Sequence, residues 1–353
     1  MRVSLDQLTG VILGTAVGDA LGLPREGLSR RRAEKMFGPP PLRHRFVLGR
    51  GMVSDDTEHA CMTAQALLRC PDDADAFARA LAWRLRFWLL GLPAGIGSAT
   101  LRGILKLWLG FPPRSSGVWS AGNGPAMRTA ILGVCLGEDV EKLRAYVRVC
   151  TRLTHRDPRA ERGALLIALA AHHGAGHGPG SVRATDFLAT ARAALPDADD
   201  RLRDFLARIE DHLERGSSVV QFADDLGLRH GVSGYIYHTV PVVLYAWLRW
   251  SGDFRRTVEE VIALGGDADT TGAISGALAG ATSGVRGIPA EWLDGICEWP
   301  RSVAWMRTLA ERLASRESKQ GSPPLCWPAL VPRNVLFLVL VLLHGFRRLL
   351  PPY

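Results

Sequence analysis

The amino-acid sequence predicts an all-α fold, a single compact multi-helix domain with an apolar tail at its C-terminal end. Apolar residues recur at three- and four-residue spacing along most of the chain, and convincing β-type alternation is not found. Gly- and Pro-rich stretches separate these periodic segments and mark the turns between helices. With 353 residues, 47% of them hydrophobic and 22% charged, the chain is long and apolar enough to bury a large core.

The first predicted helix starts near the N-terminal end. Ser4 and Gln7 match a capping box, and apolar residues at positions 5, 8, 12 and 16 share one face of the helix that follows. This apolar run is short and Asp19 interrupts it, so it lacks the pattern of a signal peptide, and we expect a cytoplasmic protein. Further helices are predicted over residues 57–69, 75–91, 160–174, 185–195 and 237–250.

The composition changes near the C-terminal end. Residues 1–312 are predicted to form the folded domain, residues 313–333 a Ser- and Pro-rich linker, and residues 334–353 an apolar tail. The apolar run Val335–Leu343 is shorter than the roughly 20 residues that a membrane-spanning helix needs. We expect the tail to be a helix or strand packed on the domain or on a partner subunit. The alternative is a surface membrane anchor, with the two arginines that follow the run facing phosphate headgroups.

Charge and cysteine content narrow the kinds of partner. The net charge of +8 is carried mainly by arginine and suits an anionic ligand such as a phosphate. The basic residues are scattered and form no dense run with interleaved aromatic residues, so we expect no nucleic-acid partner. The six cysteines contain no C-x-x-C pair and are expected to be reduced, mostly buried thiols.

Two acid-rich segments stand more than 200 residues apart, each at the start of a predicted helix: Ser54-Asp55-Asp56-Thr57 and Asp267-Ala268-Asp269-Thr270. A helix N-terminus needs one capping Asp or Thr, so two carboxylates in each segment exceed that need. Four carboxylates brought together would repel one another unless cations neutralise them. Because every donor is an oxygen, these segments favour Mg²⁺ or Mn²⁺ over zinc or copper. Helix capping without a metal is the alternative.

Three groups of small residues and histidines complete the pattern. Gly122-Asn123-Gly124 lets backbone N–H groups approach an anion, and residues 126–132 can follow as a helix whose N-terminus favours phosphate; an ordinary turn is the alternative. Three glycines on one helical face predict close helix packing that holds the second acid segment in place: Gly272, Gly276 and Gly280. Three histidines in a Gly-rich stretch are expected to be solvated: His172, His173 and His177.

Six segments, in this order, together resemble the ADP-ribosylglycohydrolase family, including its dinitrogenase reductase-activating and ADP-ribosylarginine hydrolase branches. They read GTAVGDALGLPREG, VSDDTEHA, GNGPAMRTAILG, THRDPRAERGA, GVSGYIYHTVPVVLYAW and LGGDADTTGAISGALAGATSG. The similarity extends from about residue 5 to about residue 300. Six ordered segments are far more specific than any one of them, and the resemblance implies an all-α domain with two Mg²⁺ or Mn²⁺ ions.

The resemblance also implies roles for individual residues. The metal positions would be Ser54, Asp55, Asp56, Asp267, Asp269 and Thr270. Glu26, on a loop over the site, and Asp56 would act as general acid or base, in an order that the sequence does not assign. The residues facing the ADP-ribose would be Ser120, Gly122, Asn123, Gly124, His155 and Tyr235.

The activity implied by the resemblance is hydrolysis of the bond between C1″ of ADP-ribose and an acceptor. The partner would be an ADP-ribosylated protein or a small ADP-ribose conjugate, with ADP-ribosylarginine preferred over O-linked ADP-ribosylserine or O-acetyl-ADP-ribose. Two further alternatives are an inactive ADP-ribose-binding protein and a phosphohydrolase that cuts the pyrophosphate and releases AMP. All four aspartates and Glu26 are present, which favours an active enzyme.

Overall fold

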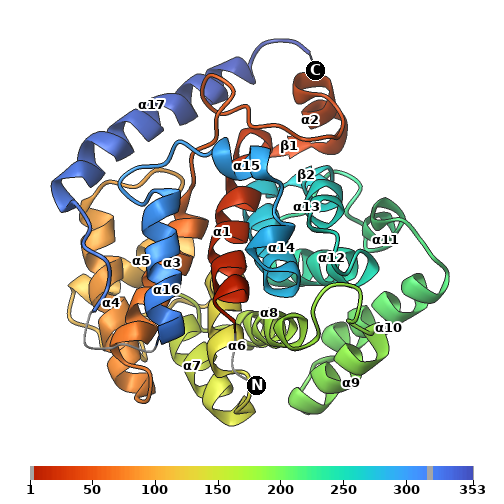
Figure 1. Cartoon of the computed structure of the whole chain (residues 1–353), viewed down its shortest axis with the longest axis horizontal. Coiled ribbons are helices and arrows are strands. Elements are labelled where there is room, and N and C mark those ends of the chain that lie inside the picture. Colours follow the sequence, from red (N-terminus) through yellow and green to blue (C-terminus); the bar gives the residue numbers. More distant parts are fainter. Residues whose placement is uncertain (1–3, 316–320, 353) are drawn as a thin grey trace.

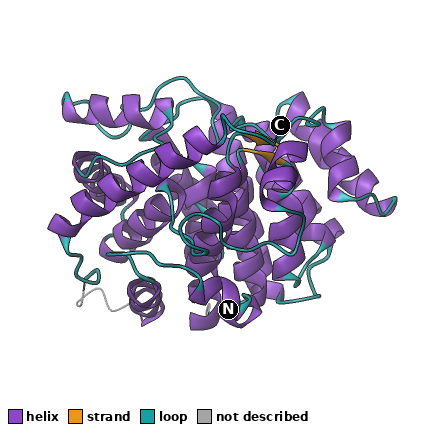
Figure 2. Ribbon diagram, turned by 90° about the horizontal axis from the view of Figure 1, so that it is seen from above, coloured by secondary structure: helices purple, strands orange, loops and turns teal. Residues whose placement is uncertain are grey.

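The computed structural model describes residues 4–315 and 321–352, which form seventeen α-helices and one two-stranded sheet (Figure 1). The predicted all-α fold is confirmed, and Figure 2 shows the small sheet among helices that surround it. The helices are α1 (Leu5–Gly22), α2 (Arg30–Phe37), α3 (Asp55–Arg69), α4 (Ala74–Leu90), α5 (Ser98–Trp108), α6 (Ala130–Leu136), α7 (Val140–Arg152), α8 (Pro158–His177), α9 (Ala184–Ala194), α10 (Asp200–Glu214), α11 (Val219–Asp225), α12 (Ile236–Arg249), α13 (Phe254–Ile262), α14 (Ala268–Ser283), α15 (Ala290–Asp294), α16 (Val303–Ser315) and α17 (Leu330–Arg347).

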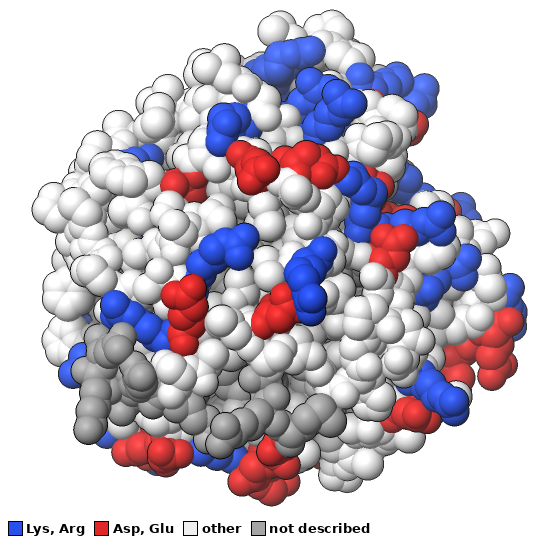
Figure 3. Space-filling model, in the orientation of Figure 1, with Lys and Arg blue, Asp and Glu red and all other residues white. Residues whose placement is uncertain are grey.

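The helices predicted from periodicity are present. α1 begins with the expected capping box, in which the Ser4 side chain accepts a hydrogen bond from the Gln7 backbone N–H. α3, α4, α8, α9 and α12 cover the other five predicted segments. On the face shown in Figure 3, basic and acidic side chains are interspersed, with basic side chains gathered near α2.

α1 and α14 lie side by side at the centre of the domain (Figure 1), and their glycines set the spacing. A Cβ atom on Gly276 would stand 2.1 Å from the Gly14 carbonyl oxygen, and one on Gly272 would stand 2.5 Å from that of Gly18. No side chain fits at such distances, so the two backbones touch directly. The predicted role of the glycine face is therefore confirmed, and the close contact fixes the end of α1 beside the beginning of α14.

The sheet joins the segments that follow α1 and precede α14. β1 (Leu28–Ser29) pairs antiparallel with β2 (Gly265–Gly266), and the Gly27 N–H donates to the Gly266 carbonyl at 2.7 Å. Both glycines of β2 have positive φ angles, 70° and 80°, a conformation that costs glycine little and other residues much more. This pairing brings Glu26, just before β1, close to Asp267, just after β2.

α17 crosses one side of the domain (Figure 1) and is held by buried polar contacts. Arg333 forms a buried ion pair with Glu298 at 2.7 Å. The same two side chains satisfy both backbone polar groups of Val53. Arg333 donates to the Val53 carbonyl at 2.6 Å, and the Val53 N–H donates to the Glu298 carboxylate at 3.1 Å. Asn334 donates to the Gly91 carbonyl at 2.6 Å. The tail is therefore a helix packed on its own domain, which was the preferred expectation.

The structure corrects the predicted boundaries of the tail and the argument about its length. The boundaries at 312/313 and 333/334 fall inside α16 and α17, and residues 316–320 of the predicted linker lie outside the described residues. The helical stretch Trp327–Arg347, with a mean hydropathy of 1.9, is long and apolar enough to cross a membrane by length and composition alone, so the argument from shortness was wrong. The surface-anchor alternative is not borne out, because Arg348 donates to the Pro24 carbonyl at 3.3 Å instead of lying free at the surface.

The prediction of three solvated histidines in a Gly-rich loop was wrong for His173 and for the loop, whereas His177 is exposed and His172 is half-buried. α8 continues through the glycines of this stretch to His177, and His173 is buried. The His173 ring stacks on that of His177 at 4.1 Å and packs edge-on against Phe187 and Trp247. Glycines suggested a loop, but packing of one face of α8 on neighbouring helices overrides their low helix propensity.

Burial of His173 predicts a loss of stability in mild acid. Burial, with a smaller contribution from His177, lowers the pKa of His173 from 6.5 to about 4, so the folded state holds the ring neutral. The stabilisation is complete above the unfolded pKa and is lost as pH falls from 6.5 towards 4. Denaturant unfolding at about pH 7.5 and about pH 5 should show a smaller acid-induced loss in His173→Gln than in the wild type, by about 1 kcal/mol. An equal loss in both proteins would contradict this assignment.

Candidate functional site

The structure brings the two acid segments together at the N-terminal ends of α3 and α14. The Thr270 hydroxyl donates to Asp56 Oδ2 at 3.3 Å, which links residues 214 positions apart. The Ser54 hydroxyl donates to the same oxygen at 3.1 Å and also caps α3 by accepting from the Asp56 N–H. Ser54, Asp56, Asp269 and Thr270 are all buried, while Asp55 and Asp267 are partly exposed.

Asp19 is a member of this cluster that the sequence did not identify. It is fully buried on α1, and its carboxylate accepts hydrogen bonds from the Ser54 N–H at 2.9 Å, the Thr57 N–H at 3.2 Å and the Thr57 hydroxyl at 2.6 Å. Burial, only partly offset by these bonds, raises the pKa of Asp19 from 3.8 to about 6. Asp19 thus ties α1 to the start of α3. Its signal in the sequence was an acid within an otherwise apolar helix.

The clustered carboxylates are strongly perturbed. Burial raises the pKa of Asp55, of Asp56 and of Asp269 well above the usual range, and neighbouring carboxylates raise each further. Asp56 Oδ1 and Asp269 Oδ1 are buried without a hydrogen-bond donor in the described part of the chain. A desolvated carboxylate oxygen without a donor is costly, so either protons or cations must balance these charges.

The donor chemistry of the cluster fits hard cations. It offers carboxylate and hydroxyl oxygens, which Mg²⁺ and Mn²⁺ prefer, and two of those oxygens have no hydrogen-bond donor among the residues that the structure describes. Within residues 4–315 and 321–352, no three Asp, Glu, His or Cys side chains are already grouped as a metal centre. The fit therefore rests on the donor types and on the unpartnered oxygens of Asp56 and Asp269.

A cavity of about 640 Å³ opens next to the acid cluster. Ten of the predicted site residues line it: Glu26, Asp55, Ser120, Gly122, Asn123, Gly124, His155, Asp267, Asp269 and Thr270. Ser54 and Asp56 do not line the cavity and are buried beside it. Tyr235 does not line it either, because its ring packs against Tyr237 and His238 and its hydroxyl accepts from Arg159 at 3.4 Å. Only the backbone of Tyr235 lies beside Gly122.

The glycine loop is joined directly to the acid cluster through Asn123. The Asn123 side-chain amide donates to Asp267 Oδ2 at 2.6 Å and to the Thr239 hydroxyl at 3.0 Å. A Cβ atom on Gly122 would stand 2.9 Å from His155 Nε2, so glycine is required for this close approach. The predicted helix over residues 126–132 needs correction, since a 3₁₀ turn comes first and α6 begins at Ala130. The helix N-terminus therefore does not adjoin the loop.

His155 lies beneath the loop as a neutral ring. It is 3% exposed, and its Nδ1 atom is 2.8 Å from the Thr154 hydroxyl oxygen. Burial, followed by the charge of Arg128, lowers the pKa of His155 to about 3. His155 is thus suited to hydrogen bonding with a ligand and not to pairing with its charge.

Glu26 borders the cavity at the end of the 3₁₀ turn Leu23–Arg25. Burial raises the pKa of Glu26, the charge of Asp267 raises it further, and the charge of Arg348 lowers it. Arg348 follows α17 and was not expected near the site. The tail therefore contributes one positive charge beside the candidate catalytic acid.

Comparison with known proteins places this geometry in a family. The model of the family described as ADP-ribosylglycohydrolase matches residues 2–323. The ADP-ribosyl-dinitrogen reductase glycohydrolase of Rhodospirillum rubrum is 30% identical over 306 residues, which cover 82% of this chain and 90% of that relative. The ADP-ribosylarginine hydrolase Tri1 of Pseudomonas putida is 27% identical, over 89% of this chain and 79% of that protein.

A solved structure agrees with the sequence comparisons. The protein described as an ADP-ribosylglycohydrolase-related protein complex aligns with a TM-score of 0.65 and 28% identity, and the alignment covers 90% of this chain and 99% of that one. The family match spans all of the acid segments, the glycine loop and the histidine that line the cavity, and it ends before α17 begins. From the agreement of sequence, fold and site, this chain belongs to the ADP-ribosylglycohydrolase family of hydrolases.

Proposed function

We propose that this chain hydrolyses the bond between C1″ of ADP-ribose and a modified arginine side chain, and so releases intact ADP-ribose. The observation that carries the proposal is that the acid cluster and the glycine loop share one cavity and are joined by the Asn123–Asp267 hydrogen bond. Support for arginine as the acceptor comes from the Pseudomonas putida relative, which is described as an ADP-ribosylarginine hydrolase.

We assign two Mg²⁺ or Mn²⁺ ions to the acid cluster. The residues that would hold them are Ser54, Asp55, Asp56, Asp267, Asp269 and Thr270. When bound, such ions neutralise the carboxylates, orient ribose hydroxyls and increase the acidity of water. The buried oxygens Asp56 Oδ1 and Asp269 Oδ1, which lack donors among the described residues, are the strongest support for this assignment.

Glu26 is the group that we assign to proton transfer. It borders the cavity, and burial and the neighbouring Asp267 charge raise its pKa above that of an ordinary glutamate, which favours proton uptake by this side chain. Asp56 was the other candidate, but it lies outside the cavity lining and its Oδ2 atom is occupied by two hydroxyl donors. We therefore assign Asp56 to holding the cluster together, and Glu26 to accepting a proton from the attacking water.

The ADP-ribose itself would lie along the glycine loop. The Asn123 N–H already donates to the Gly234 carbonyl at 2.9 Å, and the Gly122 N–H donates to the Ser120 hydroxyl at 3.3 Å. We therefore place the pyrophosphate towards Gly124, with the neutral His155 ring below it as a hydrogen-bonding partner. Because Tyr235 does not line the cavity, we no longer assign it a contact with the adenine.

Removal of the Asn123 amide should weaken metal binding. In Asn123→Ala, Asp267 loses the bond that orients it, and such supporting contacts are worth about 10–100-fold in metal affinity. Activity titrated with Mn²⁺ should show a correspondingly higher half-saturating concentration, with partial recovery of rate at high Mn²⁺. The matched control is Thr239→Val, which leaves the bond from Asn123 to Asp267 in place and should shift the titration less. Equal shifts in the two variants would contradict this role.

The acceptor linkage is tested by a direct comparison of substrates. One peptide carries ADP-ribose on arginine and a second carries it on serine, and kcat/KM is measured for both with Mn²⁺ present. The proposal predicts preference for the arginine-linked peptide, whose strongly basic guanidine is the easier leaving group once protonated. Faster turnover of the serine-linked peptide would reassign the enzyme to O-linked substrates and leave its hydrolase class unchanged.

A further inference from the structure

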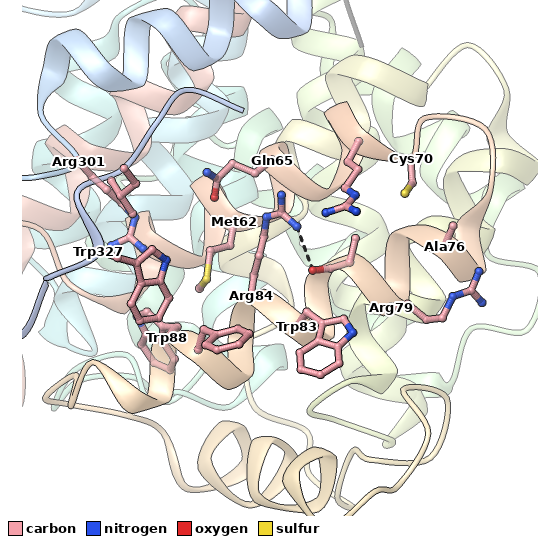
Figure 4. A pocket seen from close by; sticks show the side chains of 14 residues that line it. Met62, Gln65, Cys70, Ala76, Arg79, Trp83, Arg84, Trp88, Arg301 and Trp327 are labelled. Carbon is pink, nitrogen blue, oxygen red and sulfur yellow. Dashed lines mark hydrogen bonds between the residues drawn. The ribbon is translucent and has the colours of Figure 1, made fainter. Parts of the chain in front are cut away.

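A second large cavity, of about 650 Å³, lies between α3, α4 and the segment that precedes α17 (Figure 4). It shares no lining residue with the cavity at the acid cluster. Four arginines line it, no acidic residue appears among its lining residues in the described chain, and four aromatic rings complete its wall. A pocket with this lining has an excess of positive charge beside apolar surface.

Gln65 provides an unused polar group inside this cavity. The residue is 9% exposed, and Figure 4 shows its amide on the same side of the cavity as the Arg84 guanidinium. In residues 4–315 and 321–352, the Gln65 amide has no hydrogen-bond partner. The amide of Gln65 is therefore available to exchange hydrogen bonds with a ligand that enters the cavity.

Two of the four arginines also lack a counter-charge. Arg301 is paired with Glu58, and Arg79 stands 3.9 Å from Asp73. Arg69 and Arg84 have no carboxylate within ion-pair distance in the described part of the chain, and Arg84 donates only to the Ala80 carbonyl of its own helix, at 3.1 Å. Arg84 is partly buried, and burial together with the charge of Arg69 lowers its pKa. Two neighbouring guanidinium groups of this kind suit a phosphate, which accepts paired N–H donors.

The aromatic wall offers surface for a planar ring. Trp83, Phe87 and Trp327 are 54%, 43% and 42% exposed, which is high for such large side chains. Phe87 stacks with Trp83 at 5.9 Å and meets Trp327 edge-on at 5.6 Å, so the three rings form one continuous surface. Trp327 belongs to the C-terminal segment, beyond residue 323 where the family match ends. This wall is therefore partly built from sequence outside the family model.

We propose that this cavity binds a phosphorylated compound with a planar ring, of the size of a nucleoside monophosphate. The phosphate lies between Arg69 and Arg84, the ring lies against the wall formed by Trp83, Phe87 and Trp327, and the Gln65 amide bonds to a polar edge of the ligand. The cavity volume falls in the range of roughly 300–1,000 Å³ that is common for small-molecule sites. The site is independent of the hydrolase activity, because it shares no residue with the acid-lined cavity.

Calorimetry with the full chain tests the proposal. The probes are AMP, GMP and UMP, together with inorganic phosphate, which lacks the ring, and adenosine, which lacks the phosphate. At least one nucleotide should bind, and phosphate and adenosine should each bind at least about tenfold more weakly, since each keeps only part of the contacts. Failure of all three nucleotides to bind, or phosphate binding as tightly as the best nucleotide, would overturn the proposal.

Variants assign the binding to this cavity. Gln65→Leu and Arg84→Gln should each weaken the best nucleotide about tenfold or more, while release of ADP-ribose by the other cavity stays unchanged. The matched control is Arg102→Gln on α5, because Arg102 is exposed and does not line the cavity. Nucleotide binding that survives both cavity variants, or falls equally in the control, would place the nucleotide elsewhere and overturn the assignment.

Discussion

Asp269→Asn is expected to reduce kcat/KM by about 100-fold or more, because the proposed metal site loses one of its carboxylates and the transition state loses the charge stabilisation that depends on it. Asparagine has almost the same shape, so packing at the start of α14 is retained. The measurement is release of ADP-ribose from an arginine-linked peptide at saturating Mn²⁺. Activity within a few-fold of the wild type would contradict a metal role for Asp269.

The same substitution is expected to stabilise the metal-free protein. Burial first, and then the charges of Glu26, Asp267 and Asp56, raise the pKa of Asp269, and its Oδ1 atom has no donor in the described residues. Removing one buried charge from this cluster should raise the free energy of unfolding in EDTA by about 1–3 kcal/mol. Thermal unfolding with EDTA and with Mn²⁺ checks this, and metal should stabilise the wild type more than the variant.

The control for both effects is Asp294→Asn, which removes an exposed acid at the end of α15. It should change neither ADP-ribose release nor the unfolding temperature in EDTA, since surface substitutions of this kind have small effects. A variant that loses activity and is also less stable in EDTA would indicate simple structural damage at Asp269. The opposite signs of the two effects are what distinguish a ligand position from a packing position.

The second large effect is expected in Arg333→Met, which leaves Glu298 as an uncompensated buried charge and removes the donor to the Val53 carbonyl. Loss of one partner from a buried ion pair typically costs about 3–5 kcal/mol, so the variant should unfold at much lower denaturant concentration. Arg347→Met, at the exposed end of the same helix, is the matched control and should cost less than about 0.5 kcal/mol.

A double-mutant cycle with Glu298→Gln isolates the contact itself. Gln keeps the shape of Glu298 and removes its charge, so Arg333→Met should cost less in that background, with a coupling of about 1–3 kcal/mol. Because Val53 directly precedes Ser54, the single variant should also raise the Mn²⁺ concentration needed for activity. Additive costs, with no change in metal requirement, would mean that α17 packs on the domain without supporting the site.

Local patterns predicted the helices and the two halves of the acid cluster. Helical periodicity located α3, α4, α8, α9 and α12, and the glycine face of α14 predicted its contact with another helix. The acid segments were recognisable because each holds more carboxylates than helix capping needs. Such features depend on residues close in sequence, which is why they can be read without a structure.

Features created by distant residues were missed. Asp19 reaches α3 only because α1 packs against its neighbours, and Arg348 approaches Glu26 only because α17 folds back across the domain. Tyr235 lies next to the loop in space, yet its ring turns away towards Tyr237 and His238, a direction set by packing that its position in the sequence does not reveal.

The most direct test of the proposed function is product analysis after incubation with an arginine-linked ADP-ribosyl peptide, with Mg²⁺, with Mn²⁺ and with EDTA. The wild type should release intact ADP-ribose only when metal is present, and Glu26→Gln should release it at least about 100-fold more slowly while still binding ADP-ribose. AMP as the product would point to cleavage of the pyrophosphate. Release that persists in EDTA would contradict the metal assignment, and binding of ADP-ribose without turnover of any linkage would contradict catalysis itself.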